Sequence, residues 1–290
     1  MTYDLVIGNR VYSSWSLRGW LLFEVFGIPV RLHRARLYTE ELPELLKSFP
    51  PARTAPTMRT PDGLVVPESL AIAEELASRH PDAGIWPQDP RARGVARVLA
   101  AEMHAGFTAL RSHCPMNLRV SYTDCAPPDA VLADLDRLQQ IWAWARVETG
   151  STTPWLCGAY SAADVFFAPV ATRIATYNLP VGAEAAGYVQ AHLAHPAFRR
   201  WRAMGLVDGA DQEFYRRDYP RRDWPGPRPL PARAVDGSEA ENSACPYSGD
   251  PVTHVLELEG RRFGFCNAFC RDKTVADPEA WPKFVALYQS

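Results

Sequence analysis

Three serines precede an apolar run near the start of the chain. The stretch VYSSWSLRGWLL, residues 11–22, places Ser13, Ser14 and Ser16 ahead of a segment with helical apolar spacing. Serine is a preferred N-cap residue, so Ser16 alone explains the start of a helix. The two earlier hydroxyls are one turn away and can donate to an anion at the positive helix end. We therefore predict that Ser16 is the N-cap and that Ser13 or Ser14 binds an anion.

Two further motifs belong with this serine cluster. TAPT, residues 54–57, places Ala55 before Pro56 at the start of an expected strand. PES, residues 67–69, places Glu68 and Ser69 at the start of an expected helix, whose free N–H groups are suited to a carboxylate. An α/β fold would bring these motifs together into one site.

The elements that must position these motifs alternate between strand and helix. Apolar runs and turn residues predict strands at 3–8, 28–37, 55–60 and 63–67, and helices at 16–26, 39–47 and 68–80. Gly27 is the expected C-cap of the first helix. The order β-α-β-α-β-β-α predicts a small α/β sandwich over residues 1–82.

Strand signals are absent from about residue 89 to residue 203, and we predict an all-helical second domain over residues 88–215. Residues 91–113 read as one long helix, on which His104, Thr108 and Arg111 form a polar stripe beside an apolar one. Such a stripe is either solvated or lines a cleft. Farther on, Ser161 and Asp164 have the spacing of a capping box.

A proline-rich segment and a small cysteine-bearing module end the sequence. Residues 216–243 carry five prolines between positions 220 and 231, and we expect an extended linker that packs neither as helix nor as strand. Residues 244–290 regain apolar content and contain Cys245, Cys266 and Cys270. The last two cysteines are four residues apart, which predicts one face of a helical turn.

Three thiols in so short a segment indicate a structural metal, because the segment has little core of its own. Zinc normally takes four ligands, and His254, Asp250 or water are the candidates for the fourth position. Three thiolates also suit copper(I). A tail of free thiols that packs on the helical domain is the alternative interpretation.

Composition excludes some classes of partner. The 290-residue chain has a formal net charge of −2, which predicts neither a nucleic-acid partner nor an anionic membrane surface. No apolar run approaches the roughly 20 residues that span a bilayer, and residues 1–4 lack a basic signal-peptide start. A cytoplasmic location is expected.

In this order, the motifs resemble those of glutathione transferases over residues 3–205. SSWSLR, AP and ESLAI match the thioredoxin-like domain of that family, and SAADVFFAPV matches its helical domain. The serine cluster is most similar to the zeta class, which includes maleylacetoacetate isomerases, and EMHAGFTALR with CPMNLR resembles a bacterial branch of that class. The C-terminal cysteines, with the lead-in GRRFGFC, resemble TRASH and YHS-type metal-binding modules.

The resemblance implies roles for the motif residues. A serine hydroxyl would orient the glutathione thiolate. A zeta-style alignment through Arg18 favours Ser13 and is preferred, whereas a theta-style alignment favours Ser14. Ala55, before the cis Pro56, would hydrogen-bond the cysteinyl unit. At the γ-glutamyl end, Ser69 would bind the carboxylate and Glu68 the ammonium.

The second substrate is expected between the two domains. There Arg111 would hold a carboxylate and His104 would transfer a proton. Arg173 is near a substrate-binding arginine of the zeta class, but its spacing differs and its role is not transferred. Trp15 stands where the zeta pattern has a cysteine, which argues against a mixed disulfide with glutathione.

These features predict a cytoplasmic, homodimeric glutathione transferase that acts on a small electrophile and carries a zinc-binding module. The fold class is an α/β thioredoxin-like domain, an all-α domain and a small cysteine-rich module. The alternative function is a non-catalytic, transferase-like regulatory protein whose tail senses metal or docks a partner.

Overall fold

The computed structural model describes residues 2–237 and 239–290. The chain divides into two compact units. The first comprises Met1–Leu193 and Gln212–Pro225, and the second comprises Ala194–Asp211 and Gly226–Ser290.

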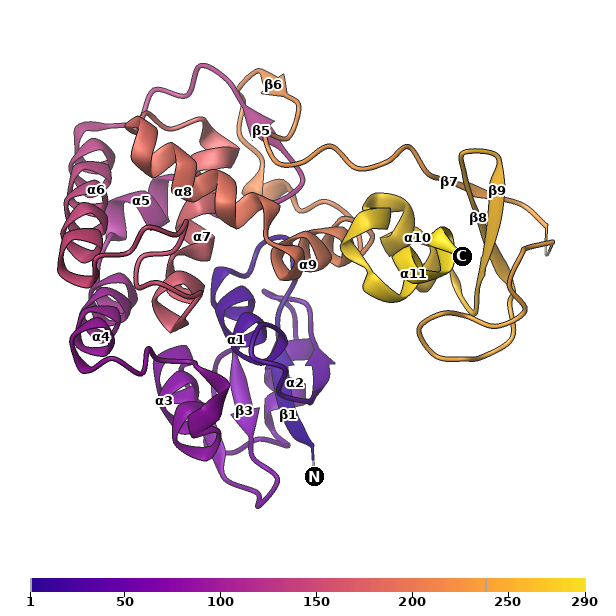
Figure 1. Ribbon diagram of the computed structural model, residues 1–290, viewed down its shortest axis with the longest axis horizontal. Helices are drawn as coiled ribbons and strands as arrows, with labels where there is room; N and C mark the ends of the chain where they lie inside the picture. Colours follow the sequence, from indigo (N-terminus) through magenta and orange to yellow (C-terminus); the bar gives the residue numbers. More distant parts are fainter. Residues whose placement is uncertain (1, 238) are drawn as a thin grey trace. The chain divides into compact units, whose positions relative to one another are not determined.

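The first unit begins with the predicted α/β sandwich (Figure 1). Its sheet has the order β2-β1-β3-β4, with β1 parallel to β2 and the other pairs antiparallel. Successive side chains of β1 face opposite ways: Leu5 lies toward Gly19 of α1, while Val6 packs with Leu46 and Phe49 beside α2. The elements are β1 (Tyr3–Ile7), α1 (Ser14–Glu24), β2 (Val30–Arg34), α2 (Glu41–Leu46), β3 (Thr57–Arg59), β4 (Val65–Pro67) and α3 (Ser69–Arg79).

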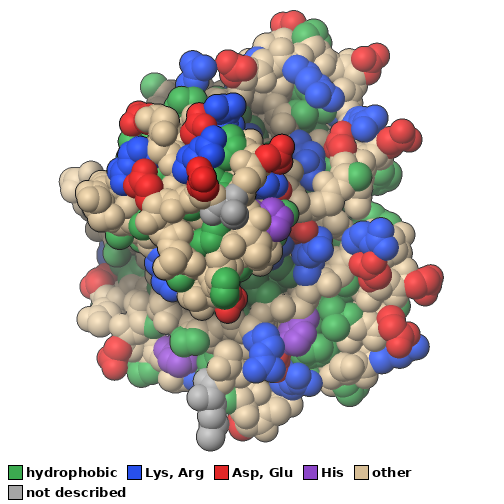
Figure 2. Space-filling view, turned by 90° about the vertical axis from the view of Figure 1, so that its right-hand side faces the viewer, with side chains coloured by type: hydrophobic (Ala, Val, Ile, Leu, Met, Phe, Trp, Pro, Cys, Tyr) green, Lys and Arg blue, Asp and Glu red, His purple; other side chains and the backbone are tan. Residues whose placement is uncertain are grey.

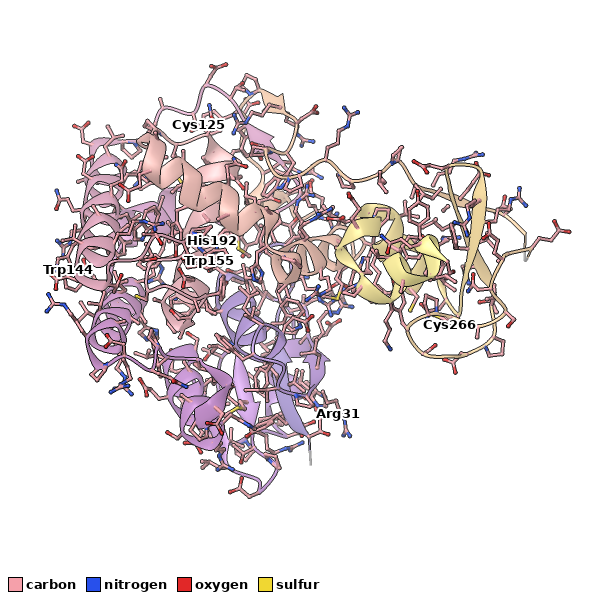
Figure 3. The ribbon with its side chains drawn as sticks, in the orientation of Figure 1. Arg31, Cys125, Trp144, Trp155, His192 and Cys266 are labelled. Carbon is pink, nitrogen blue, oxygen red and sulfur yellow. The ribbon has the colours of Figure 1, made fainter. Side chains whose placement is uncertain are left out.

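A helical domain follows in the same unit and confirms the second part of the predicted fold class, although it also contains the two-residue strand β5 (Ser121–Tyr122). The described helices of this domain are α4 (Pro90–Ala105), α5 (Thr108–His113), α6 (Asp129–Thr149), α7 (Ala162–Tyr177) and α8 (Ala183–Ala194). Helix α7 is buried along its whole length and packs against α1. Its capping box of Ser161 and Asp164 is present as predicted. Beside it, the rings of Trp155 and His192 lie 5.2 Å apart (Figure 3).

The prediction of one helix over residues 91–113 is wrong. Helix α4 ends at Ala105, and α5 begins at Thr108 after Phe107 takes a left-handed conformation with φ of 60°. The backbone turns so tightly that a Cβ at Gly106 would lie 2.8 Å from the carbonyl oxygen of Glu102. The new helix is held by the carboxylate of Asp134, which accepts a hydrogen bond from the Leu110 N–H. These contacts interrupt the helix although the apolar spacing over residues 91–113 is helical.

The expectation that residues 216–243 form no strand is also wrong. In the first unit, β6 (Arg221–Arg222) pairs with β5 (Ser121–Tyr122). In the second, β7 (Arg233–Val235) is the edge strand of a sheet with order β7-β8-β9. The five prolines lie outside the paired residues, so each short strand keeps the N–H groups that a ladder needs.

The second unit combines α9 (Pro196–Leu206) with the C-terminal module. Helix α9 contacts α10, and Arg199 forms an ion pair of 2.6 Å with Asp277. Phe263, Phe265 and Phe284 are part of a small buried core. The remaining elements of the module are β8 (His254–Leu258), β9 (Arg261–Phe265), α10 (Ala268–Ala276) and α11 (Pro282–Gln289).

Among the described residues, no helix combines the length and the apolar character that crossing a membrane requires. On the face shown in Figure 2, Lys and Arg side chains are interspersed with Asp and Glu. This mixture agrees with the small net charge of the chain.

The start of α9 makes stability depend on pH. Burial, together with the Arg200 charge, lowers the pKa of His195 to about 4. In the unfolded chain, His195 takes up a proton near the ordinary histidine pKa of about 6.5. The folded protein therefore keeps its full stability above about pH 6.5. It loses up to about 3 kcal/mol as the pH falls toward 4, because only the unfolded state then binds the proton readily. Nδ1 of His195 also caps α9 by accepting from the Ala197 N–H.

We predict that His195→Asn, which keeps a capping oxygen, loses less stability than the wild type between neutral pH and about pH 4.5. Urea unfolding of both proteins at each pH measures this difference. Parallel losses in the two proteins would contradict the prediction.

Candidate functional site

Helix α1 begins earlier than predicted, and its N-cap is Ser13 rather than Ser16. The Ser13 hydroxyl accepts a hydrogen bond from the Ser16 N–H (3.2 Å) and donates one to the Ser16 Oγ (2.7 Å). Ser16 is fully buried, and its hydroxyl accepts from the Gly8 N–H after β1. Ser16 lies within the first turn of α1 and does not cap it. Its side chain instead connects the helix to the end of β1. Both hydroxyls therefore have structural partners.

Ser14 is placed differently. Its Oγ lies 3.3 Å from Nη2 of Arg173, which donates to it from α7. Among the described residues the Ser14 hydroxyl has no other hydrogen-bond partner, so its own proton is available to a ligand. Ser13 and Ser14 both line a cavity between the α/β and helical domains.

This cavity has a volume of about 470 Å³ and is strongly basic. The described residues that line it include Arg111, Arg173 and Arg217 but neither Asp nor Glu. None of the three arginines has a carboxylate partner in the part of the chain that the structure describes. A partly buried site whose guanidinium groups have no carboxylate partner among the described residues is suited to an anionic ligand.

The side chain of Trp15 links several candidate residues. The guanidinium carbons of Arg18 and Arg111 lie 4.5 and 4.7 Å from its ring centroid, and the His104 ring lies 5.3 Å away. Arg111 thus reaches the cavity despite the helix break, whereas His104 does not line it. Nε2 of His104 instead lies 3.6 Å from the carboxylate of Glu68.

The surroundings of His104 lower the pKa of its ring. Burial lowers its pKa, the Glu68 carboxylate opposes this, and the Arg18 and Arg111 charges add to the lowering. Its Nδ1 is buried and has no hydrogen-bond partner among the described residues.

The α3 start has two features that indicate a ligand. Glu68 is exposed and has φ of 75°, a conformation that is rare outside glycine and occurs often at functional sites. Ser69 is fully buried, yet its Oγ has no hydrogen-bond partner in the described chain. A buried hydroxyl is normally satisfied, so this one lacks an acceptor or donor that a ligand would supply.

Ala55 and Pro56 are joined by a cis peptide bond just before β3. Pro56 is buried against α1, where a Cβ on Gly19 would lie 2.6 Å from the Cβ of Pro56. Only glycine permits this approach, because the obstacle is a rigid ring held by the strand.

We predict that Gly19→Ala destabilises the protein by about 1–3 kcal/mol through overpacking. Gly94→Ala is the matched control, since a Cβ there meets nothing within 4 Å inside α4, and it should stabilise by up to about 1 kcal/mol. Thermal unfolding of the two variants measures both effects. The same sign at both positions would contradict the prediction.

Sequence reasoning missed one wall of the cavity. A short 3₁₀ turn at Glu213–Tyr215 places the Tyr215 ring in a stack with Tyr12, 4.3 Å between centroids. The Tyr12 hydroxyl also accepts from the Gln212 N–H, and the Tyr215 hydroxyl donates to Tyr38. This wall joins segments about 200 residues apart, and no local motif marks it.

The three C-terminal cysteines come together, but Cys266 and Cys270 do not share one helical turn as predicted. Cys266 follows β9 (Figure 3), and Cys270 is in α10, whose N-cap is Asn267. Their sulfur atoms are 3.9 Å apart, and with Cys245 the three sulfurs lie within 4.8 Å of one another. Asp250 and His254 are outside this group.

The surroundings of Cys245 favour a thiolate. Burial alone would raise its pKa, but the backbone N–H groups of Cys266, Ser248 and Tyr247 donate to its sulfur, and its pKa falls to about 7. Burial raises the pKa of Cys270 to about 12, while the Lys273 charge opposes the rise. The group therefore combines one sulfur that ionises near neutral pH with another that needs a cation to lose its proton.

Comparisons with known proteins agree with this architecture. Residues 12–79 match the family model for the N-terminal domain of glutathione S-transferase. A glutathione transferase homolog from Burkholderia gl BGR1, solved with bound glutathione, is 20% identical, with a TM-score of 0.54 over 71% of this chain and 100% of that one. No curated protein matches the chain.

Two further structures have the same TM-score at lower sequence identity. Glutathione transferase Omega 1C from Trametes versicolor is 16% identical, with a TM-score of 0.54 over 69% of this chain and 90% of that one. A homolog from Lodderomyces elongisporus, with two GSH per subunit, is also 16% identical, with a TM-score of 0.54 over 70% and 98% of the two chains. The chain therefore has the glutathione transferase fold, and the predicted fold class is confirmed.

Proposed function

We propose that this protein is a glutathione transferase that activates the glutathione thiol for reaction with a small, anionic electrophile. The observation that carries the proposal is the buried hydroxyl of Ser69 at the start of α3, which has no hydrogen-bond partner among the described residues. It lies within residues 12–79, which match the N-terminal domain model of glutathione S-transferase. Relatives with this fold were solved with glutathione bound.

The γ-glutamyl end of glutathione would bind at α3. Its carboxylate would accept from Ser69 and from the first N–H groups of the helix. Its ammonium would pair with Glu68, which is exposed at this helix start. His104 lies beside Glu68 and outside the cavity, so we assign its neutral ring to this end of the ligand instead of the electrophile. Ala55 would pair through its backbone with the cysteinyl unit.

We assign the thiolate to Ser14. The hydroxyl of Ser13 both accepts from and donates to Ser16, whereas the Ser14 proton has no acceptor in the described part of the chain. An ordinary thiol with a pKa near 8.5 is only a few per cent ionised at neutral pH. A hydroxyl donor at a helix N-terminus favours the ionised form.

The electrophile would carry a carboxylate. Arg111 and Arg217 line the cavity without a carboxylate partner among the described residues, and a planar guanidinium binds a carboxylate bidentately. Two reactions suit this site: conjugation at an electrophilic carbon, and reversible addition that isomerises a double bond, as in the zeta-like enzymes that the serine cluster resembles. Both begin with attack by the thiolate.

The C-terminal module would be a TRASH/YHS-like structural site for zinc. Zinc–sulfur bonds of about 2.3 Å place tetrahedral sulfurs roughly 3.8 Å apart, which suits the spacing of Cys245, Cys266 and Cys270. Water would complete the coordination, because neither His254 nor Asp250 belongs to the group. A homodimer, which the resemblance implies, is part of the same proposal.

The proposal is tested by calorimetry, which measures the affinity of the wild type and of Ser69→Ala for glutathione. The loss of a hydrogen bond to a charged group predicts about 10- to 100-fold weaker binding. Ser78→Ala is the matched control, because Ser78 lies on the same helix and, within the described residues, its hydroxyl bonds only the Glu74 carbonyl. No binding by the wild type would contradict the proposal. Binding without consumption of any carboxylate-bearing electrophile would support the non-catalytic alternative.

A further inference from the structure

Arg173 is held in one orientation by backbone carbonyls. Its Nε donates to the Cys114 carbonyl (2.9 Å) and its Nη1 to the Pro169 carbonyl (3.2 Å). Only 5% of the residue is exposed. Because these two bonds fix the guanidinium plane, Nη2 is directed at Ser14 Oγ, 3.3 Å away.

The charge of Arg173 meets no opposite charge among the residues that the structure describes. Burial and the nearby Arg111 charge lower its pKa to about 10, so it remains protonated at neutral pH. No carboxylate pairs with it among the described residues. A buried cation without a partner is costly, and an anion that arrives beside it removes part of that cost.

We propose that Arg173 is a positioning residue for the glutathione thiolate, acting through Ser14. The inference rests on the proposed function. The Arg173 N–H occupies an acceptor position of Ser14 Oγ, so the single proton of this hydroxyl is directed toward the incoming sulfur. The guanidinium charge, one hydroxyl away, favours the thiolate over the thiol.

A purely structural role predicts something different. If Arg173 only joined α7 to the Cys114 carbonyl and α1, its loss would lower stability without changing the ionisation of bound glutathione. The thiol pKa therefore separates the two roles. It is measured by the ultraviolet absorbance of the thiolate while the glutathione-saturated protein is titrated with base.

The experiment is a double-mutant cycle with Ser14→Ala and Arg173→Met. Each single variant should raise the pKa of bound glutathione by about one unit or more. The double variant should exceed the larger single effect only slightly, since Arg173 acts through Ser14. Arg173→Lys keeps the charge in a different shape and should give a smaller shift; it replaces the Met variant in the cycle if the latter does not fold.

Arg222→Met is the matched control. Arg222 also donates to a serine, with Nε 2.9 Å from Ser121 Oγ, but it does not line the cavity. This variant should leave the glutathione pKa unchanged. An unchanged pKa in both Arg173 variants, or additive effects in the cycle, would overturn the inference while glutathione binding still supported the proposed function. If the wild type bound no glutathione, both would fail.

Discussion

Removal of metal from the cysteine site is expected to unfold the C-terminal module. In the part of the chain that the structure describes, the module has two short strands beside the edge strand β7, two short α-helices and a small core of phenylalanines. This is less than an independent domain needs. Structural zinc sites supply about 10 kcal/mol or more of folding free energy. Cys245→Ser or a strong chelator should therefore abolish the protection of the β8 and β9 amides, as hydrogen exchange measures.

The control for this effect is Cys125→Ser. Cys125 is a partly exposed thiol of the first unit and lies outside the metal-binding group. It should leave both the metal content and the protection unchanged. Full protection of β8 and β9 after quantitative loss of metal would show that the module folds without it. A metal content well below one per chain in the purified wild type would contradict the site itself.

Ser14→Ala is expected to lower kcat/KM by about 10- to 100-fold at neutral pH, with little change in glutathione affinity. The variant loses a hydrogen bond to a charged sulfur, worth about 1.5–3 kcal/mol. Because the unassisted thiol ionises near pH 8.5, the deficit should shrink as the pH rises through that value. Measurement of kcat/KM from about pH 6 to 9 tests both the size and the slope.

Ser13→Ala gives the contrast. Ser13 caps α1 and bonds Ser16, so this variant should lose about 1–2 kcal/mol of stability and little activity. If Ser13→Ala carried the pH-dependent deficit and Ser14→Ala did not, the thiolate would belong to Ser13, as the zeta-style alignment prefers. If the loss of kcat/KM in both variants were the same at every pH, neither hydroxyl would affect the ionisation of the glutathione thiol.

Local sequence signals predicted the elements of the α/β domain and the capping box of α7. These features depend on residues a few positions apart, such as Ser161 and Asp164, whose reciprocal bonds form within one turn. The break at Gly106 and Phe107 could not be predicted this way. It depends on Asp134, which holds the start of α5 from another helix.

The same limit applies to the candidate site. The motifs around Ser14 and Ser69 were identified from sequence because each sits at a helix start. Arg173 and Tyr215 were not assigned to the site. Their roles arise from contacts with Ser14 and Tyr12, which are more than 150 residues away in the sequence and become neighbours only through tertiary packing.

The most direct measurement is a crystal structure of the protein with bound glutathione. We predict that the sulfur lies within hydrogen-bond distance of Ser14 Oγ, on the side of Arg173, and that the γ-glutamyl carboxylate accepts from Ser69. Glutathione with its sulfur away from Ser14, or with its γ-glutamyl end away from α3, would contradict the proposed function.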